Sequence, residues 1–89
     1  MMYVNTFCDV AAIFLTVEKD IKKEIGRRLK ESRQAMSFTQ GSVAQKLSMT
    51  QQQYSRFENG VFELNYSQII FLCKLYDISA DYLFGLAEL

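Results

Sequence analysis

The segment from Gln40 to Gly60 constrains the fold most, because its apolar residues are spaced for two short helices that cross. Ala44 lies where the crossing helices would come closest, and only a small side chain fits there. Ser48 falls in the expected turn between them. The apolar positions are Val43, Leu47, Met49, Tyr54 and Phe57. This spacing predicts a helix-turn-helix, whose second helix protrudes from the body of the domain.

Helical periodicity continues on both sides of this unit. The recurrence of Ile21, Ile25 and Leu29 predicts a first helix from about Asp20 to Ala35. Further helices are expected over residues 40–47, 51–58 and 66–76, and a short last helix is expected through residue 84. The predicted N-caps are Thr39, Thr50, Asn65 and Ser79. The predicted core face of the fourth helix comprises Tyr66, Ile69, Ile70, Cys73 and Tyr76. The fold class expected is therefore all-α, with five helices.

Composition excludes several classes of function. With 89 residues, 49% of them hydrophobic, and no proline, the chain is expected to form one compact domain. There is no histidine, and the cysteines, Cys8 and Cys73, do not have the spacing of a metal site. No catalytic triad or glycine-rich phosphate loop is present, so an enzyme is not expected and no cofactor or metal is implied. The apolar N-terminal run is too short to span a membrane, and we expect reduced thiols and a cytoplasmic location.

The charge is zero overall but unevenly distributed. Residues 19–36 contain seven basic and three acidic residues, whereas residues 61–89 contain four acidic residues and one basic residue. A neutral total is unusual for a protein that binds nucleic acid, because attraction to phosphate dominates such affinity. The basic end is also what an ordinary solvated helix face would look like. The basic residues of this segment could therefore attract DNA by long-range electrostatic steering, or could simply keep the protein soluble.

The sequence from Asp20 to Gly85 resembles the Cro/CI-type helix-turn-helix domain of phage repressors and xenobiotic-response-element regulators of bacteria. The resemblance lies in "IGRRLKESRQAMSFTQGSVAQKLSMTQQQYSRFENG" and "CKLYDISADYLFG". It implies that the helix over residues 51–58 reads the DNA major groove. The base-reading residues would be Gln51, Gln52 and Arg56; the residues contacting the DNA backbone would be Thr39, Gln40, Gln53, Ser55 and Asn59. The resemblance also implies a buried ion pair between Arg33 and Glu58.

Four departures from the family pattern affect these expectations. Ser48 stands where the family usually has glycine, which is unfavourable if the residue adopts positive φ. Gly41 should weaken the helix over residues 40–47, and Tyr54 is larger than the aliphatic residue expected there. The loop over residues 61–64 is apolar and acidic where the family often has basic residues, so we do not expect this loop to bind DNA.

An apolar extension precedes the region of resemblance. We divide the chain into an N-terminal extension over residues 1–19, a possible dimerisation element, and a DNA-binding domain over residues 20–89. The three-four spacing of apolar residues from Phe7 through Phe14 to Ile21 favours a helix, although the β-branched content also allows a strand. Phe62, Phe71 and Leu75 are expected to form an apolar surface that the extension covers, within one chain or across a dimer. A local enlargement of the core is the alternative.

These features together predict a sequence-specific, dimeric transcriptional repressor that binds double-stranded DNA as a homodimer and contacts no membrane. The alternative is an antitoxin-like or anti-repressor module, which would use the apolar extension to bind a protein partner. The neutral net charge and the non-basic loop favour this alternative.

Overall fold

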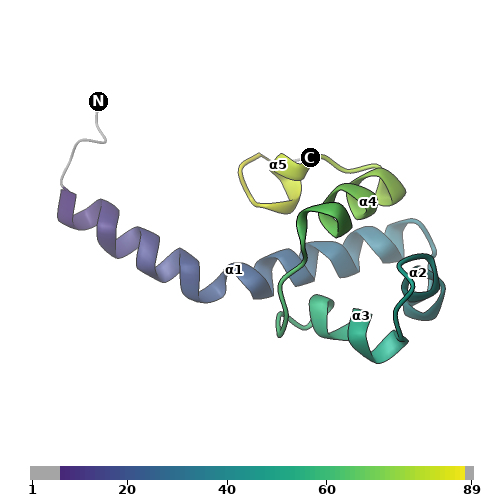
Figure 1. Ribbon diagram of the computed structural model, residues 1–89. Coiled ribbons are helices and arrows are strands. Elements are labelled where there is room, and N and C mark those ends of the chain that lie inside the picture. The colour runs from purple at the N-terminus through teal and green to yellow at the C-terminus, as the bar shows by residue number, and fades with distance from the viewer. Residues whose placement is uncertain (1–6, 88–89) are drawn as a thin grey trace.

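The computed structural model describes the backbone of residues 7–87 and the side chains of residues 21–87. That part of the chain is all-α, as predicted. Its elements are α1 (Phe7–Ala35), α2 (Gln40–Lys46), α3 (Gln51–Glu58), α4 (Tyr66–Tyr76) and α5 (Ala80–Leu83). The C-terminal half of α1 is the central element of the domain, and its N-terminal half extends beyond the other helices (Figure 1).

The four predicted N-caps are confirmed, and each begins a short helix. The hydroxyl of Thr39 accepts a hydrogen bond from the backbone N–H of Ser42. Thr50 and Asn65 each form a capping box with the glutamine three residues later. Ser79 accepts from the backbone N–H of Tyr82. Each cap satisfies an otherwise unpaired backbone donor and contributes about 1 kcal/mol, which matters because short helices are marginal alone.

From Phe7 onward the apolar extension is helical, not a strand, and it forms the first part of α1. The predicted start of the first helix near Asp20 was therefore too late, since α1 begins at Phe7. The expected boundary between residues 19 and 20 falls within this helix. The side chain of Phe14 lies outside the described side chains. Among the described residues, no helix is both long enough and apolar enough to cross a membrane.

The core lies between α1 and the four shorter helices. Its buried members are Leu29, Val43, Ala44, Tyr54, Phe57, Leu72, Tyr76 and Leu83. The large side chain of Tyr54 is accommodated because its hydroxyl lies 2.6 Å from that of Tyr76, so both buried phenols are hydrogen-bonded. Burial raises the pKa of Tyr76 to about 12 and raises the pKa of Tyr54 further, so both remain neutral.

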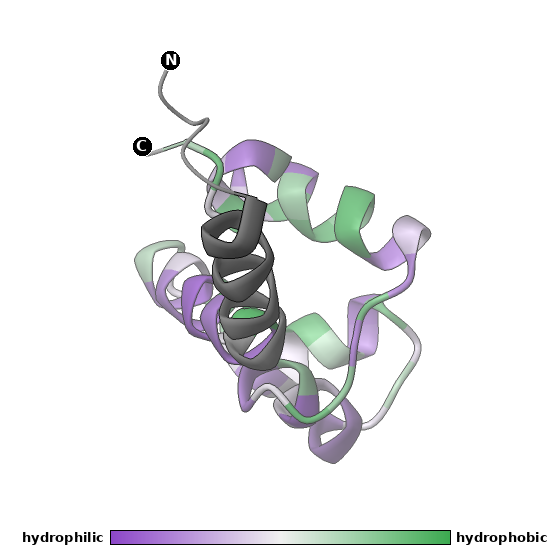
Figure 2. Cartoon of the chain, turned by 90° about the vertical axis from the view of Figure 1, so that its left-hand side faces the viewer, coloured by the Kyte–Doolittle hydropathy of each residue, from purple (hydrophilic) through white to green (hydrophobic). Residues whose placement is uncertain are grey.

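The predicted core face of α4 was partly wrong. Tyr66 and Ile70 are 85% and 56% exposed, whereas Leu72, which was not predicted, is fully buried. Tyr76 is buried, as predicted. Ile69 and Cys73 lie at the edge of the core, and burial raises the pKa of the Cys73 thiol. The middle of α4 is an unbroken run of hydrophobic residues over 69–73, coloured green in Figure 2, so periodicity could not identify the buried face.

The apolar surface predicted from Phe62, Phe71 and Leu75 is found only in part. Phe71 and Phe62 are 37% and 49% exposed, as a surface role requires. Leu75, which was expected on the same surface, is half-buried and packs against the core. A pocket of about 220 Å³ lies beside Phe62, between α1, the loop after α3, α4 and Phe84. Its lining is mainly apolar and includes Ile21, Ile25, Leu64 and Ile69.

Candidate nucleic-acid interface

The last turn of α3 is in direct backbone contact with α1. A Cβ atom placed at Gly26 would overlap the backbone carbonyl oxygens of Phe57 and Glu58. Only glycine therefore permits this close approach of the two helices. The sequence interpretation missed this role, although an isolated glycine inside a predicted helix is a signal for such packing.

A buried ion pair fixes the same end of α3. The Nε of Arg33 donates to Glu58 at 2.7 Å, and one Nη donates to the other carboxylate oxygen at 3.1 Å. The second Nη donates to the carbonyl of Phe38 at 2.9 Å. The hydrogen bond to Glu58 raises the pKa of Arg33. The Arg33 and Glu58 side chains are only 10% and 1% exposed, so the fork geometry is what compensates for the desolvation of both charges.

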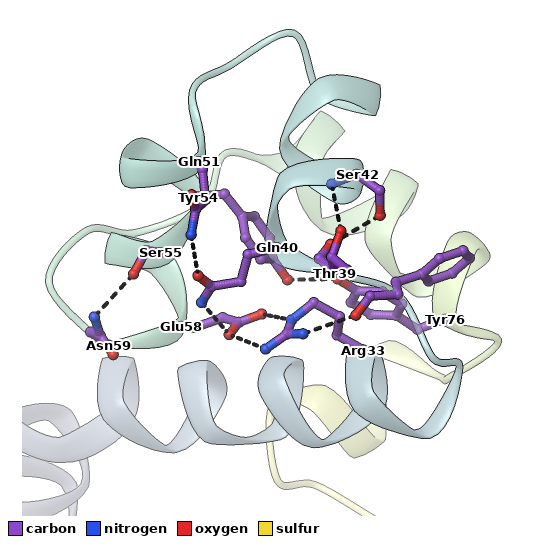
Figure 3. A network of polar contacts seen from close by, with 11 residues as sticks. Arg33, Thr39, Gln40, Ser42, Gln51, Tyr54, Ser55, Glu58, Asn59 and Tyr76 are labelled. Atoms are coloured by element: carbon purple, nitrogen blue, oxygen red, sulfur yellow. Dashed lines mark hydrogen bonds and ion pairs between the residues drawn. The ribbon is translucent and has the colours of Figure 1, made fainter.

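Gln40 connects this ion pair to the first turn of α3 (Figure 3). Its amide nitrogen donates to Glu58 at 2.9 Å, and its amide oxygen accepts from the amide of Gln51 at 3.1 Å. The hydrogen bonds also fix which way the Gln40 amide faces, because only its nitrogen can donate to the carboxylate. One continuous chain of contacts therefore runs from buried Arg33 to exposed Gln51.

The predicted base-reading residues are exposed along α3. Gln51, Gln52 and Arg56 all lie on its solvent side. Gln53, which was predicted to contact the DNA backbone, is exposed there too. Gln53 uses its amide oxygen in the Thr50 capping box, which leaves its amide nitrogen for another partner. The guanidinium of Arg56 lies over the ring of Phe62, with its central carbon 5.6 Å from the ring centroid. The sequence interpretation named both residues but did not bring them together.

The remaining predicted DNA-backbone residues lie around this surface. Ser55 is half-buried, and its hydroxyl accepts a hydrogen bond from the Asn59 amide at 3.3 Å (Figure 3). Thr39 is exposed but uses its hydroxyl to cap α2. Gln40 is half-buried, and its amide bonds to Gln51 and Glu58 rather than pointing freely outward.

The turn between α2 and α3 requires a left-handed residue. Ser48 has φ of 58°, so serine does stand at the strained position that the family pattern assigns to glycine. The backbone N–H of Met49 then donates to the carbonyl of Ala44 at 3.0 Å, which closes the turn. Gly41, in contrast, has open space where a Cβ would lie.

The basic stripe of α1 is partly neutralised by its own neighbours. Arg27 pairs with Glu24 and Glu31 at 2.9 and 2.8 Å, and these hydrogen bonds raise its pKa. The guanidinium of Arg28 lies 3.6 Å from Glu24 and over the Tyr82 ring, with its central carbon 5.9 Å from the ring centroid. Such exposed pairs contribute little to stability. Among the described residues, no cluster of side chains has the composition of a metal site.

Comparison with known proteins identifies the same architecture. A family model described as a helix-turn-helix domain matches residues 26–89. The HTH-type transcriptional regulator ImmR of Bacillus subtilis (strain 168) is 36% identical over 64 residues, covering 72% of this chain and 50% of that protein. Two further proteins of that organism also match: the uncharacterized HTH-type transcriptional regulators YobD and YqaE, at 29% and 36% identity over 70% and 62% of this chain. This chain spans about half the length of each relative. It belongs to the Cro/CI-type helix-turn-helix family.

Proposed function

We propose that this protein is a sequence-specific, dimeric transcriptional repressor whose helix α3 lies in the major groove of DNA. The observation that carries the proposal is the construction of α3. Its last turn is fixed by Gly26 and by the Arg33–Glu58 pair, while its first turn presents three exposed glutamines. A protruding helix with polar side chains at its exposed end is what major-groove recognition requires.

The glutamine amides supply the chemistry of base recognition. An amide that donates and accepts in one plane matches the adenine edge, and one such bidentate contact discriminates by about 1–3 kcal/mol. Gln51 is pre-oriented by Gln40, whereas Gln52 has no hydrogen bond among the described side chains. Arg56 is the third base-reading residue. The residues that contact the DNA backbone in this proposal are Thr39, Gln40, Gln53, Ser55 and Asn59.

Selection of bound sequences from random DNA tests this assignment. Gln52→Ala should relax the preference at one position of each half-site, because one base contact is lost. Asn59→Ala is the matched backbone variant and should weaken all sequences alike. It is a cleaner control than Gln40→Ala, since Gln40 also holds Gln51. A uniform loss of affinity in both variants would contradict base reading by Gln52.

A symmetric operator requires two copies held about 34–36 Å apart. We propose that the extension over residues 1–19 contributes to this homodimer, near Phe71 or Leu75. The helical backbone that extends beyond the domain, and the 37% exposure of Phe71, support this part of the proposal. A small monomer rarely tolerates a large exposed apolar surface.

Phe14→Asp and truncation before Glu18 both test the dimer. Each should yield monomers in analytical ultracentrifugation and weaken operator binding, because a buried charge or a missing helix removes the contact. A truncated protein that remained dimeric at micromolar concentration and bound DNA normally would exclude the extension as the dimer contact. The interface would then be sought around Phe62 and α5.

Repression would follow from occupancy, with the bound dimer excluding polymerase from the promoter. The proposal includes a cytoplasmic location and no cofactor or catalytic activity. A second candidate is a protein-interaction module, and the exposure of Val61 (53%) and Phe62 (49%) favours it. Gel filtration separates the two. A discrete dimer that shifts promoter DNA supports the repressor, whereas aggregation relieved by a co-expressed protein supports the module.

A further inference from the structure

The loop after α3 is folded back onto the base-reading surface. Gly60 adopts φ of 75° and reverses the chain at the end of the helix. The backbone N–H groups of Val61 and Phe62 then both point to the carbonyl of Arg56, at 2.9 and 3.4 Å. This geometry brings the Phe62 ring under the Arg56 guanidinium, with 5.6 Å between the guanidinium carbon and the ring centroid.

Phe62 can hold Arg56 without using any of its hydrogen-bond donors. Among the described side chains, no carboxylate lies within ion-pair distance of Arg56. An ion pair would engage the same N–H groups that bind guanine, whereas an aromatic ring contacts the flat face and leaves the edge free.

We propose that Phe62 is a positioning residue for base recognition and acts through Arg56. The inference rests on the proposed DNA-binding function and deepens it. The loop over residues 61–64 contributes to specificity although it lacks the positive charge that would bind phosphate. A guanidinium that already lies over an aromatic ring loses less freedom of motion when it meets a base, because the contact has already restricted it.

Binding-site selection with three single variants tests the proposal. Arg56→Ala first identifies the operator position that Arg56 reads. Phe62→Leu should then reduce discrimination at that same position by about two- to fivefold, the fold-change equivalent to an exposed cation–π contact. Phe62→Tyr keeps the ring and should restore the discrimination of the unaltered protein. Leucine retains apolar volume beside the pocket, so the fold is expected to persist, and the melting temperature checks this.

The double variant Arg56→Ala with Phe62→Leu provides the decisive comparison. If Phe62 acts through Arg56, replacing it should not change discrimination further once the arginine is absent. An effect of Phe62→Leu that persists undiminished without Arg56 overturns the proposal. A uniform loss at all operator positions, accompanied by a shift to monomer in ultracentrifugation, also overturns it and assigns Phe62 to the dimer interface.

A measurement without DNA distinguishes this inference from the proposed function. The ring should shift the NMR signals of the Arg56 δ-protons in the free protein, and Phe62→Leu should abolish that shift while Phe62→Tyr retains it. Failure of the unaltered protein to enrich any sequence would refute sequence-specific binding, and this inference with it. If Gln52→Ala alters preference but Phe62→Leu does not, only the positioning role is refuted.

Discussion

The last turn of α3 is buried against α1, whereas its first turn is exposed and is held by the Thr50 capping box and by the amide of Gln40. At the buried end, two helix backbones touch at Gly26 and a nearly solvent-free ion pair joins Arg33 to Glu58. At the exposed end, Gln51 makes one hydrogen bond to Gln40, at 3.1 Å. In this helix of 8 residues the buried contacts with α1 therefore lie at one end, and the exposed amides that we propose read DNA lie at the other.

Glu58→Ala should have the largest effect on stability, because it strands the Arg33 charge in the core. Loss of one member of a buried pair typically costs about 3–5 kcal/mol. Glu31→Ala is the matched control, since it breaks the exposed pair with Arg27 and should cost less than about 1 kcal/mol. Urea unfolding followed by circular dichroism measures both. Equal losses would mean that the buried end of α3 is not specially stabilised by its charges.

Gly26→Ala should destabilise the domain by about 1–3 kcal/mol, because the added methyl overlaps the α3 backbone. Helix propensity alone would instead give a gain of up to about 1 kcal/mol, so the sign of the change is informative. Gly41→Ala is the control and should show that gain, since nothing lies within 4 Å of its Cβ position. Thermal unfolding compares the two. A gain at both positions would contradict the close contact between α1 and α3.

Ser48→Gly should stabilise the protein by up to about 1 kcal/mol, since it removes the strain of a left-handed serine at φ of 58°. This turn connects α2 to the exposed first turn of α3, so the variant should stabilise the chain next to that exposed end. Ser67→Gly, at an exposed position within α4, should instead lose stability. Losses in both variants would mean that the turn is not strained.

Gln51→Ala should change stability least, by less than about 0.5 kcal/mol, as is usual for exposed positions. The same variant should alter base preference in the selection experiment, because the pre-oriented amide is lost. The expected result is thus a change in recognition without a change in melting temperature. A marked loss of stability would mean that the Gln40–Gln51 contact supports the fold and not only the reading surface.

The success of sequence reasoning varied with the range of the interaction. Helix caps such as Thr50 and Asn65 depend on backbone groups three residues away, so the local sequence was sufficient to predict them. Buried positions of the two-helix unit, such as Val43 and Tyr54, were also predicted, because a steep crossing permits few arrangements. The buried face of α4 was predicted only in part, since Ile70 and Leu72 are both strongly hydrophobic and only the neighbouring helices decide which of them is buried.

The candidate site shows the same limit. The spacing and the family resemblance identified Gln51, Gln52 and Arg56 as surface residues, and these lie exposed on α3. The connections among side chains were not predicted. Gln40 reaches Glu58 across 18 positions of sequence, and Arg56 meets Phe62 only because Gly60 reverses the chain. Such contacts depend on the relative placement of helices and loops, which no periodicity specifies.

Because α1 is continuous over 29 residues, its length sets how the N-terminal segment is rotated relative to the rest of the domain. An uninterrupted α-helix transmits rotation, so each residue inserted before Asp20 would turn the N-terminal segment by about 100° and shift it by about 1.5 Å. If two copies pair through that segment, one added residue would rotate the two α3 helices out of register with successive major grooves. Seven added residues complete nearly two turns, about 20° short, and would return the domains to nearly their original relative orientation. Each copy would then lie farther from the paired segment by about 10 Å. The spacing of operator half-sites would then follow the length of α1 in helical steps.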